Sequence, residues 1–406
     1  RRSGPAGARS RARPRHDLRQ PGHARRYQRT ARRARLHAGL LGADAGRVPP
    51  AARRGAVSFG RRWVAAGLRR PSEASKGFRT APRRATGPGP AVLRGGRLRR
   101  PANDVALSVP HVALIKLFVG SSTGNLLVAL EEDIDKVFQN SSKVVAVHSE
   151  DEEILKKNKK LIKNGDVHSH PVWRSEECAI SSTRRIVRLA EKYDKKAHIL
   201  HITTKQEIDF LSQHKGNITF EITPQHLTIY APDCYNKLGT YAQMNPPIRD
   251  KSHYDRLWYA VQKNLNDTIG SDHAPHLKEN KDKEYPNSPS GMPGVQTLMP
   301  VMLDHVNHGR LSLTQLINLV CENPVKIFGI QNKGFIKEGY DADFTIIDMD
   351  KKITIKNENI ESKCSWSPFN GFEFKGTPVA TIISGRIKMN NGKILGDPEG
   401  TPLKFI

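Results

Sequence analysis

Short apolar runs recur along the chain from about residue 112 and predict buried β-strands. Five runs are rich in β-branched residues and are bounded by polar, Gly or Pro positions: 112–120, 143–150, 196–203, 217–223 and 267–273. Such runs are typical of strands buried on both faces of a parallel sheet. Stretches with helical periodicity lie between them. Residues 254–265 form one, and residues 175–196 form another, in which five apolar side chains share a face: Ile180, Ile186, Val187, Leu189 and Ala190.

The pattern changes after residue 333 to alternating apolar and polar positions. Residues 334–350, 351–357 and 378–394 read as antiparallel strands, and the sequence NNGK at 390–393 is a favourable hairpin turn. Strands that alternate with helices indicate a parallel α/β barrel, whereas strands joined by turns indicate a small β domain. We therefore expect an α/β barrel catalytic domain over residues 110–332 and a β-sandwich portion over residues 333–406.

Residues 1–109 form an atypical segment that is rich in Arg, Gly and Pro. The first 100 residues hold 27 Arg, 1 Lys and 3 acidic residues, but no Ile and no Asn. The remaining 306 residues hold 38 basic and 37 acidic residues, so nearly all of the net charge of +26 lies in the first segment. Gly and Pro interrupt every periodic pattern there, and we expect the segment to be poorly ordered and to lack a dense core.

Three interpretations of this segment stay open. A basic arm could bind nucleic acid through phosphates, but only four aromatic residues are available for base stacking: Tyr27, Phe59, Trp63 and Phe78. A transit peptide would be Arg-rich and acid-poor, yet also Ser-rich and shorter. The third interpretation is a shifted reading frame or a chimeric join near residues 101–112. Since the charge is confined to one segment, nucleic acid is not the expected partner of the protein as a whole.

The remaining composition favours a cytoplasmic protein. The hydrophobic share is 37%, and no run of 18 apolar residues predicts a membrane span. The start of the chain lacks the apolar core of a secretory signal. The four cysteines are widely spaced and fit neither a CxxC metal motif nor a disulfide framework: Cys178, Cys234, Cys321 and Cys364.

Four polar residues lie in or at the ends of the predicted strands. Lys116 lies inside the first, His148 and His201 end the second and third, and Asp272 ends the fifth. Each has an ordinary structural explanation, as a hydrogen-bonded core histidine, a snorkelling lysine or a helix-capping aspartate. Parallel strands, however, bring their carboxyl ends to one face, and imidazole and carboxylate are the usual zinc ligands. The four residues together predict a metal site.

Lys116 requires its own chemistry in such a site. A buried amine is costly to keep charged, so we expect a neutral, nucleophilic side chain. A neutral amine can take up carbon dioxide, and the resulting carbamate is an anionic oxygen ligand that can bridge two metals. The motif HSH at residues 168–170 also suggests a metal pair, but it follows the polar sequence NGDV. We interpret it as a loop and leave it out of the metal set.

Six motifs, in order, resemble the dihydroorotases of the amidohydrolase superfamily: IKLFVGSSTGNLLV, VAVHSEDEEIL, HILHITT, EITPQHL, MNPPIRD and IGSDHAPH. Two later stretches resemble the closing β-sandwich of that superfamily: GYDADFTIID and SPFNGFEFKGTPVATIISGR. The resemblance covers about residues 110–400. It implies a TIM-barrel metal hydrolase that reversibly cyclises N-carbamoyl-L-aspartate to (S)-dihydroorotate, a step of de novo pyrimidine biosynthesis.

The resemblance also implies roles for individual residues. Lys116 would be a carboxylated lysine bridging two zinc ions, His148 and His201 would bind the second zinc, and Asp272 would bind the first. Asp272 would also act as general base and acid. Four further residues resemble substrate-binding positions: Asn245, His276, Pro293 and Gly294. The second histidine of HAPH favours dihydroorotase over allantoinase and dihydropyrimidinase, because it can hold a substrate carboxylate.

The chain departs from the family at the first barrel strand, where an HxH pair ligates the first zinc. The nearest sequence is RHDLRQPGH at residues 15–23, in which Arg19, Pro21 and Gly22 match but Arg15 and Asp17 replace the two histidines. We therefore expect an incomplete first zinc site and missing or replaced N-terminal strands. An inactive dihydroorotase-like subunit is the alternative in another class, although the four metal positions are intact. A homo-oligomer is a further expectation.

Overall fold

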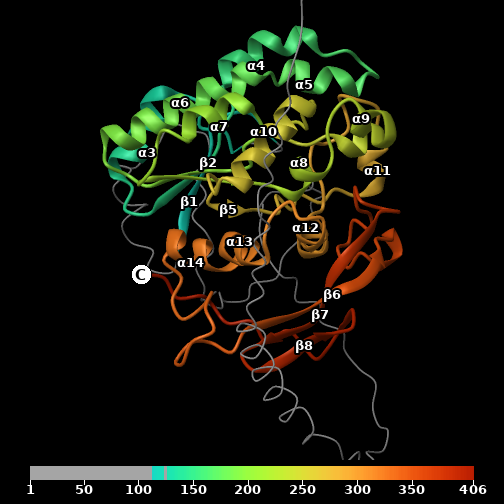
Figure 1. The fold of residues 1–406 in the computed structure, drawn as a ribbon. Coiled ribbons are helices and arrows are strands. Elements are labelled where there is room, and N and C mark those ends of the chain that lie inside the picture. Colours follow the sequence, from blue (N-terminus) through green and yellow to red (C-terminus); the bar gives the residue numbers. More distant parts are fainter. Residues whose placement is uncertain (1–111, 123–125) are drawn as a thin grey trace, which may run out of the picture. The chain divides into compact units, whose positions relative to one another are not determined.

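The computed structural model describes residues 112–122 and 126–406, coloured along the sequence in Figure 1. The segment predicted over residues 1–109 lies outside the described residues, so the expectations about its order stay predictions. The same holds for Arg15, Asp17, Arg19, Pro21 and Gly22.

Five parallel strands form the first sheet, in the order of the sequence. They confirm the five apolar runs: β1 (Leu114–Phe118), β2 (Val144–His148), β3 (Ala197–Ile199), β4 (Ile218–Ile222) and β5 (Thr268–Ile269). The register aligns Lys116 with Ala146, and Phe118 with His148. Consecutive parallel strands with helical connections have the topology of an arc of a (β/α) barrel.

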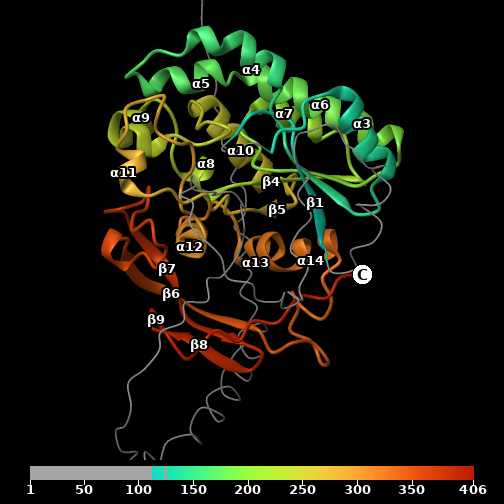
Figure 2. The same ribbon diagram turned by 180° about the vertical axis from the view of Figure 1, so that it is seen from behind.

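Helices connect these strands. They are α3 (Glu131–Asn140) before β2; α4 (Glu152–Asn158), η1 (Lys159–Leu161), η2 (Val167–Ser169), α5 (His170–Trp173) and α6 (Glu176–Lys192) before β3; α7 (Lys205–Leu211) before β4; and α8 (Pro224–Thr228), α9 (Asp233–Leu238), η3 (Gly239–Ala242) and α10 (Lys251–Gln262) before β5. Figures 1 and 2 show α3, α6 and α7 close to the strands of this sheet.

Helix α6 shows how the sequence pattern becomes packing. The Ser175 side chain caps its first turn by accepting the backbone N–H of Cys178. The apolar residues predicted on one face are all buried: Ile180, Ile186, Val187, Leu189 and Ala190. Four of them join the core that the strands also form, in which Ile199 and Phe220 lie. Burial of this stripe, rather than helix propensity alone, stabilises the helix.

The loop predicted over residues 168–170 is wrong. Residues 167–169 form the 3-10 helix η2, and His170 begins α5. The Asp166 side chain caps η2 by accepting the backbone N–H of His168. The two histidines face different surroundings, since His168 is exposed and His170 is fully buried.

Helices follow β5 and lead to a second, antiparallel sheet. They are α11 (Lys278–Lys281), α12 (Leu298–Asn307), α13 (Leu313–Ile317), the π-helix η4 (Asn318–Glu322) and α14 (Asn323–Phe328). The second sheet contains β6 (Phe344–Thr354), β7 (Glu373–Ile383), β8 (Arg386–Asn390) and β9 (Lys393–Ile394), with η5 (Asn357–Asn359) between β6 and β7. The β8–β9 turn has positive φ at both central residues, 47° at Asn391 and 82° at Gly392, as predicted for the NNGK hairpin.

Helix α12 joins this second sheet to the rest of residues 112–406 (Figure 1). Asp304 Oδ1 accepts the backbone N–H of Lys375 at 2.8 Å, and Asn307 Nδ2 donates to the carbonyl oxygen of Lys375 at 2.7 Å. Gly376 is required at this contact, because its φ is 101° and a Cβ there would lie 2.9 Å from the Leu303 side chain. The second sheet corresponds to one layer of the predicted β-sandwich portion.

Within the described part of the chain, no helix has both the length and the apolar character needed to cross a membrane.

Helix α11 ends at a fully buried lysine. Lys281 Nζ donates to the carbonyl oxygens of Gln243 at 3.2 Å and Pro289 at 2.8 Å, and it lies 5.8 Å from the centroid of the Trp366 ring. Burial lowers the pKa of Lys281 from 10.5 to about 7. The side chain thus joins the segments around residues 243 and 289 through neutral oxygens alone.

We predict that Lys281 makes stability rise with pH. Between pH 7 and 10.5 the unfolded chain binds a proton at Lys281 that the folded chain does not, so the free energy of unfolding rises by up to about 1.4 kcal/mol per pH unit. The penalty for burying the ammonium is fully present below pH 7. Chemical unfolding of the wild type and Lys281→Met at pH 7.0 and 9.0 measures the difference.

The matched control is Lys278→Met, which changes an exposed lysine of the same helix and is expected to keep the wild-type pH profile. Parallel stability profiles for the wild type and Lys281→Met would contradict the prediction.

Candidate metal centre

The four residues predicted to bind metal lie in or just after four of the five strands of the first sheet, β1, β2, β3 and β5. Lys116 is the central residue of β1, and His148 is the last residue of β2. His201 lies two residues after β3, and Asp272 lies three residues after β5. Because the strands are parallel, the last three positions all lie beyond the carboxyl edge of the sheet.

The two histidines point ring nitrogens at each other. His148 Nδ1 lies 3.1 Å from His201 Nε2, and the ring centroids are 4.8 Å apart in an edge-on arrangement. Both side chains are buried, and burial lowers the pKa of each below its ordinary value. Both rings are therefore neutral near pH 7, which is the form that binds metal.

A buried carboxylate fixes the orientation of His148. Glu150 Oε2 lies 2.9 Å from His148 Nε2, so the neutral ring donates its Nε2 proton to Glu150 and keeps a lone pair on Nδ1. Burial of Glu150 opposes its ionisation, but the Arg174 guanidinium and the His148 hydrogen bond outweigh burial and lower the pKa to about 2. Arg174 also donates to the carbonyl oxygen of Ser121. A carboxylate that orients a metal-binding imidazole in this way is a common feature of metal sites.

Lys116 and Asp272 lie within electrostatic reach of each other and of the histidines. Burial lowers the pKa of Lys116 to about 8, against the opposing effect of the Asp272 and Glu221 carboxylates. Burial raises the pKa of Asp272 to about 6, with Lys116 opposing the rise. Lys116 also contributes to the lowered pKa values of His148 and His201. The structure thus places Lys116 within electrostatic range of the other three predicted residues.

Two of these residues have an uncommon backbone conformation. His201 and Asp272 both have φ of 39°, in the left-handed region that favours glycine. Each follows a buried strand, His201 by two residues and Asp272 by three. Strained non-glycine residues persist where their surroundings fix them, and they concentrate at functional sites.

Three of the predicted substrate-binding residues lie on two adjacent segments. His276 Nε2 is 3.0 Å from the Ser290 carbonyl oxygen, and the Gly294 N–H donates to His273 Nδ1 at 3.1 Å. A Cβ on Gly294 would lie 2.4 Å from the Ser271 carbonyl oxygen, so this position requires glycine. Residues 271–276 and 290–294 therefore lie side by side, with Pro293 buried between Met292 and Gly294.

Asn245 joins this group less directly. Its Oδ1 lies 3.1 Å from His170 Nε2. Gln243, two residues earlier, accepts the Gly291 N–H at 2.9 Å through its backbone oxygen, and its side chain donates to the Ser288 carbonyl oxygen at 3.0 Å. The Asn245 segment therefore packs on the segment that leads to Pro293.

Sequence reasoning missed several residues around this pocket. Glu150 and Arg174 fix His148, Lys281 joins the substrate-side segments, and Glu221 contributes to the pKa values of Lys116 and Asp272. For Glu150 a signal was present, because it follows His148 at a spacing of two after a buried strand. Arg174 and Lys281 lie in polar stretches whose pattern gives no sign of burial.

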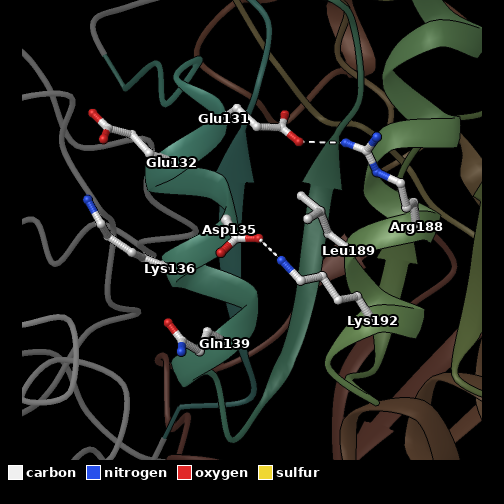
Figure 3. Close-up of a pocket in the computed structure, with 8 residues that line it drawn as sticks. All are labelled: Glu131, Glu132, Asp135, Lys136, Gln139, Arg188, Leu189 and Lys192. Atoms are coloured by element: carbon white, nitrogen blue, oxygen red, sulfur yellow. Dashed lines mark hydrogen bonds and ion pairs between the residues drawn. The ribbon is translucent and has the colours of Figure 1, made fainter.

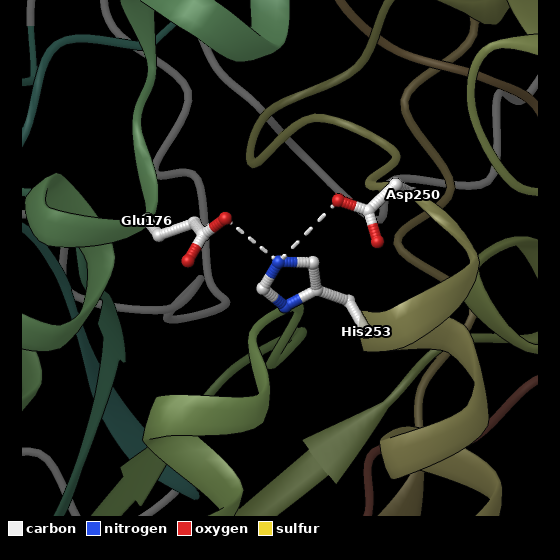
Figure 4. Close-up of side chains that lie close together, drawn as sticks. All are labelled: Glu176, Asp250 and His253. Carbon is white, nitrogen blue, oxygen red and sulfur yellow. Dashed lines mark hydrogen bonds and ion pairs between the residues drawn. The ribbon is translucent and has the colours of Figure 1, made fainter.

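A second group of potential ligands lies elsewhere, at the N-terminal ends of α6 and α10. Glu176, Asp250 and His253 place one potential ligand atom each within 4.8 Å of one another (Figure 4). The His253 ring is already committed, since Nδ1 accepts the Lys205 N–H at 3.0 Å and Nε2 lies 2.8 Å from Glu176 Oε1. A neutral ring with an accepting Nδ1 carries its proton on Nε2, so no lone pair faces the carboxylates. This arrangement fits a helix-capping network better than a metal site.

A surface groove between α3 and α6 is separate from the predicted site residues (Figure 3). Its walls are joined by ion pairs from Arg188 to Glu131 at 2.6 Å and from Lys192 to Asp135 at 2.9 Å. The groove is thus lined by solvated, mutually paired charges.

Comparisons with known proteins agree with the fold. Dihydroorotase from Pyrococcus furiosus is 35% identical over 286 residues, which cover 70% of this chain and 63% of that protein. Dihydroorotase from Methanosphaera stadtmanae is 34% identical over 302 residues, which cover 72% of this chain and 68% of that protein. This chain therefore spans about two thirds of the length of these relatives, 63% and 68%.

The solved structure of L-hydantoinase (dihydropyrimidinase) from Arthrobacter aurescens is similar, with a TM-score of 0.68 and 28% identity over 71% of this chain and 67% of that chain. This similarity and the parallel sheet confirm the predicted fold class, a TIM-barrel-type α/β hydrolase with a C-terminal β portion. Residues 128–388, more than half of the chain, match the Amidohydrolase family. The resemblance that the motifs suggested is therefore confirmed: this chain belongs to the amidohydrolase family.

Proposed function

We propose that this chain is a zinc-dependent dihydroorotase, which reversibly cyclises N-carbamoyl-L-aspartate to (S)-dihydroorotate in pyrimidine biosynthesis. The observation that carries the proposal is the meeting of His148 Nδ1 and His201 Nε2 at 3.1 Å beside Lys116 and Asp272. The similarity to two archaeal dihydroorotases supports the choice of substrate.

The donor set suits a divalent metal. His148 Nδ1 keeps a lone pair because the Nε2 proton is donated to Glu150, and this lone pair accepts from His201 Nε2. With the His201 proton moved to Nδ1, which has no partner among the described residues, both facing nitrogens would offer lone pairs to a metal. Two neutral imidazoles with a nearby carboxylate are typical of zinc sites. His148, His201, Lys116 and Asp272 would hold the metal. When bound, such a metal lowers the pKa of water and polarises a carbonyl group.

Lys116 would contribute as a carbamate. The neutral amine nitrogen bonds to the carbon of carbon dioxide and loses one proton, which yields an N-carboxylate with one negative charge. Burial favours this reaction, because it lowers the pKa of Lys116 to about 8 and so raises the fraction of neutral amine near pH 7. The product would replace a half-buried ammonium group with an oxygen ligand for the metal.

Asp272 would move the proton. During ring opening it takes a proton from the attacking water and delivers it to the ring nitrogen as the amide carbon–nitrogen bond breaks. Cyclisation reverses both steps. A carboxyl with a pKa raised to about 6 can accept and return a proton near neutral pH more readily than an ordinary aspartate.

The substrate would lie against His276, Asn245 and residues 293–294. The Gly294 N–H is bonded to His273, and its carbonyl oxygen accepts from Leu298 at 3.0 Å. Within the residues that the structure describes, no hydrogen bond is recorded to the Pro293 carbonyl oxygen, so this group is the better candidate to contact the ring. His276 would hold the substrate carboxylate.

The first metal position has the poorer donor set, because Arg15 and Asp17, which lie outside the described residues, stand where the resemblance implies two histidines. Lys116 and Asp272 alone would hold a metal weakly. An inactive dihydroorotase-like subunit is the alternative that follows. A homo-oligomer, the boundary near residue 333 and a cytoplasmic location stay predictions.

We predict that metal binding depends on the histidine pair. Purified wild-type protein is expected to retain zinc by elemental analysis, and His148→Ala or His201→Ala to lose at least one zinc per chain, because each removes one of two facing imidazoles. The matched control is His168→Ala at an exposed position, which should keep the wild-type content. Equal zinc in all four proteins would contradict the assignment, whereas two zinc ions with turnover would show that residues 15–17 do no harm.

We predict that a substrate panel separates dihydroorotase from other cyclic amidohydrolases. The wild-type kcat/KM should be highest for dihydroorotate, compared with dihydrouracil, hydantoin and allantoin. His276→Phe should reduce kcat/KM for dihydroorotate by about 10- to 100-fold, because it removes a polar partner of a charged carboxylate. It should change turnover of the uncharged dihydrouracil far less. Preference for hydantoin would instead support a function like that of the Arthrobacter structure.

A further inference from the structure

The motif at residues 168–170 supplies a buried imidazole to the substrate side of the pocket. His170 is fully buried at the start of α5. Its Nε2 lies 3.0 Å from the Met244 carbonyl oxygen and 3.1 Å from Asn245 Oδ1. His170, which was not included among the predicted metal ligands, therefore contacts Asn245, a predicted substrate-binding residue 75 positions later in the sequence.

The contacts define which nitrogen of His170 carries the proton. A carbonyl oxygen only accepts hydrogen bonds, so the ring donates from Nε2. Within the described residues, Nδ1 is buried and has no hydrogen-bond partner. Burial, with the Arg174 charge, lowers the pKa of His170 to about 3. The ring is thus a neutral donor of fixed direction near pH 7.

The same contact defines the direction of the Asn245 amide. Because His170 donates, the amide oxygen must face the ring, and the Asn245 NH2 group points elsewhere. Because the Asn245 side-chain carbonyl oxygen is bonded to His170, the NH2 group is the part of the side chain that can donate hydrogen bonds to a ligand. The ligand group that it selects is therefore an oxygen acceptor, such as a carboxylate or a ring carbonyl.

Aromatic side chains hold the His170 ring in place. The Tyr285 ring lies edge-on at 5.7 Å between centroids, and the Trp173 ring lies edge-on at 5.9 Å. Tyr285 is itself buried, and its backbone oxygen accepts the Gly165 N–H at 2.8 Å. A ring packed between two aromatic side chains can direct a hydrogen bond at little entropic cost.

We propose that His170 is a positioning residue, which fixes the Asn245 side chain so that its NH2 group binds an oxygen acceptor of the substrate. This inference rests on the proposed function, because it assigns Asn245 to the substrate. The alternative is a purely structural role, in which His170 packs the start of α5 and the direction of the Asn245 side-chain amide has no effect on binding.

Calorimetric titration of the metal-loaded full chain with dihydroorotate separates the two roles. His170→Phe keeps a planar ring but removes the donor, and should raise Kd about tenfold, the equivalent of one lost hydrogen bond. His170→Gln, whose side-chain NH2 can replace Nε2–H, should recover most of the affinity. His168→Phe is the matched control in the same motif and should bind like the wild type.

A double-mutant cycle with Asn245→Ala tests whether His170 acts through Asn245. If His170 acts through Asn245, then adding His170→Phe to Asn245→Ala should change Kd by less than about twofold. The same tenfold loss in both backgrounds would overturn the proposal, and so would wild-type affinity in His170→Phe. Circular dichroism melting of each variant identifies any loss of folding. If His170→Phe does not fold, His170→Leu, which also removes the donor, replaces it in the same cycle.

Different measurements would refute the proposed function and the positioning role of His170. Wild-type protein that binds hydantoin or dihydrouracil but not dihydroorotate would refute the proposed function. The nitrogen-15 shifts of His170 test the positioning contact without any ligand. Proton retention on Nε2 supports the contact, and a proton on Nδ1 would refute it.

Discussion

The parallel pairing of β1 to β5 is the constraint on which the candidate site depends. Parallel strands end at the same edge, so His148, His201 and Asp272 lie along one edge of the sheet although they are far apart in the sequence. Lys116, within β1, lies close enough to Asp272 to be influenced by its charge. An antiparallel arrangement of the same strands would send the carboxyl ends of alternate strands to opposite edges, and no set of substitutions at the site could replace the parallel geometry.

Buried charged groups fix the orientation of side chains in the candidate metal centre. Glu150 stays ionised because Arg174 is paired with it, and the ionised carboxylate fixes the tautomer of His148. An unpaired carboxylate at this depth would take up a proton and lose its hold on the ring. Near the proposed substrate-binding residues, His170 and Lys281 are directed at backbone and amide oxygens instead of charges. An ion pair therefore orients His148, whereas hydrogen bonds to neutral oxygens hold His170 and Lys281.

The strands could be predicted from the sequence, and four candidate metal-site residues could be proposed, because both leave local signals. A buried parallel strand is a continuous apolar run, and a polar residue within or just after such a run stands out, as Lys116 and His201 do. Glu150 has the same kind of signal two positions after His148. By contrast, α5 has only four residues, too few for a helical period, and residues 168–170 were therefore predicted wrongly as a loop. The partners of Lys281 are carbonyl oxygens of distant segments, which no sequence pattern indicates.

The central claim is that side chains from these strand ends surround a metal ion. A crystal of the zinc-loaded protein measured on both sides of the zinc absorption edge tests it most directly. The account predicts an anomalous peak within coordination distance of His148 Nδ1 and His201 Nε2, with density for a carboxylated Lys116 beside it. Zinc bound only at Glu176, Asp250 and His253, or absent from the pocket in a protein that retains it in solution, would contradict the account.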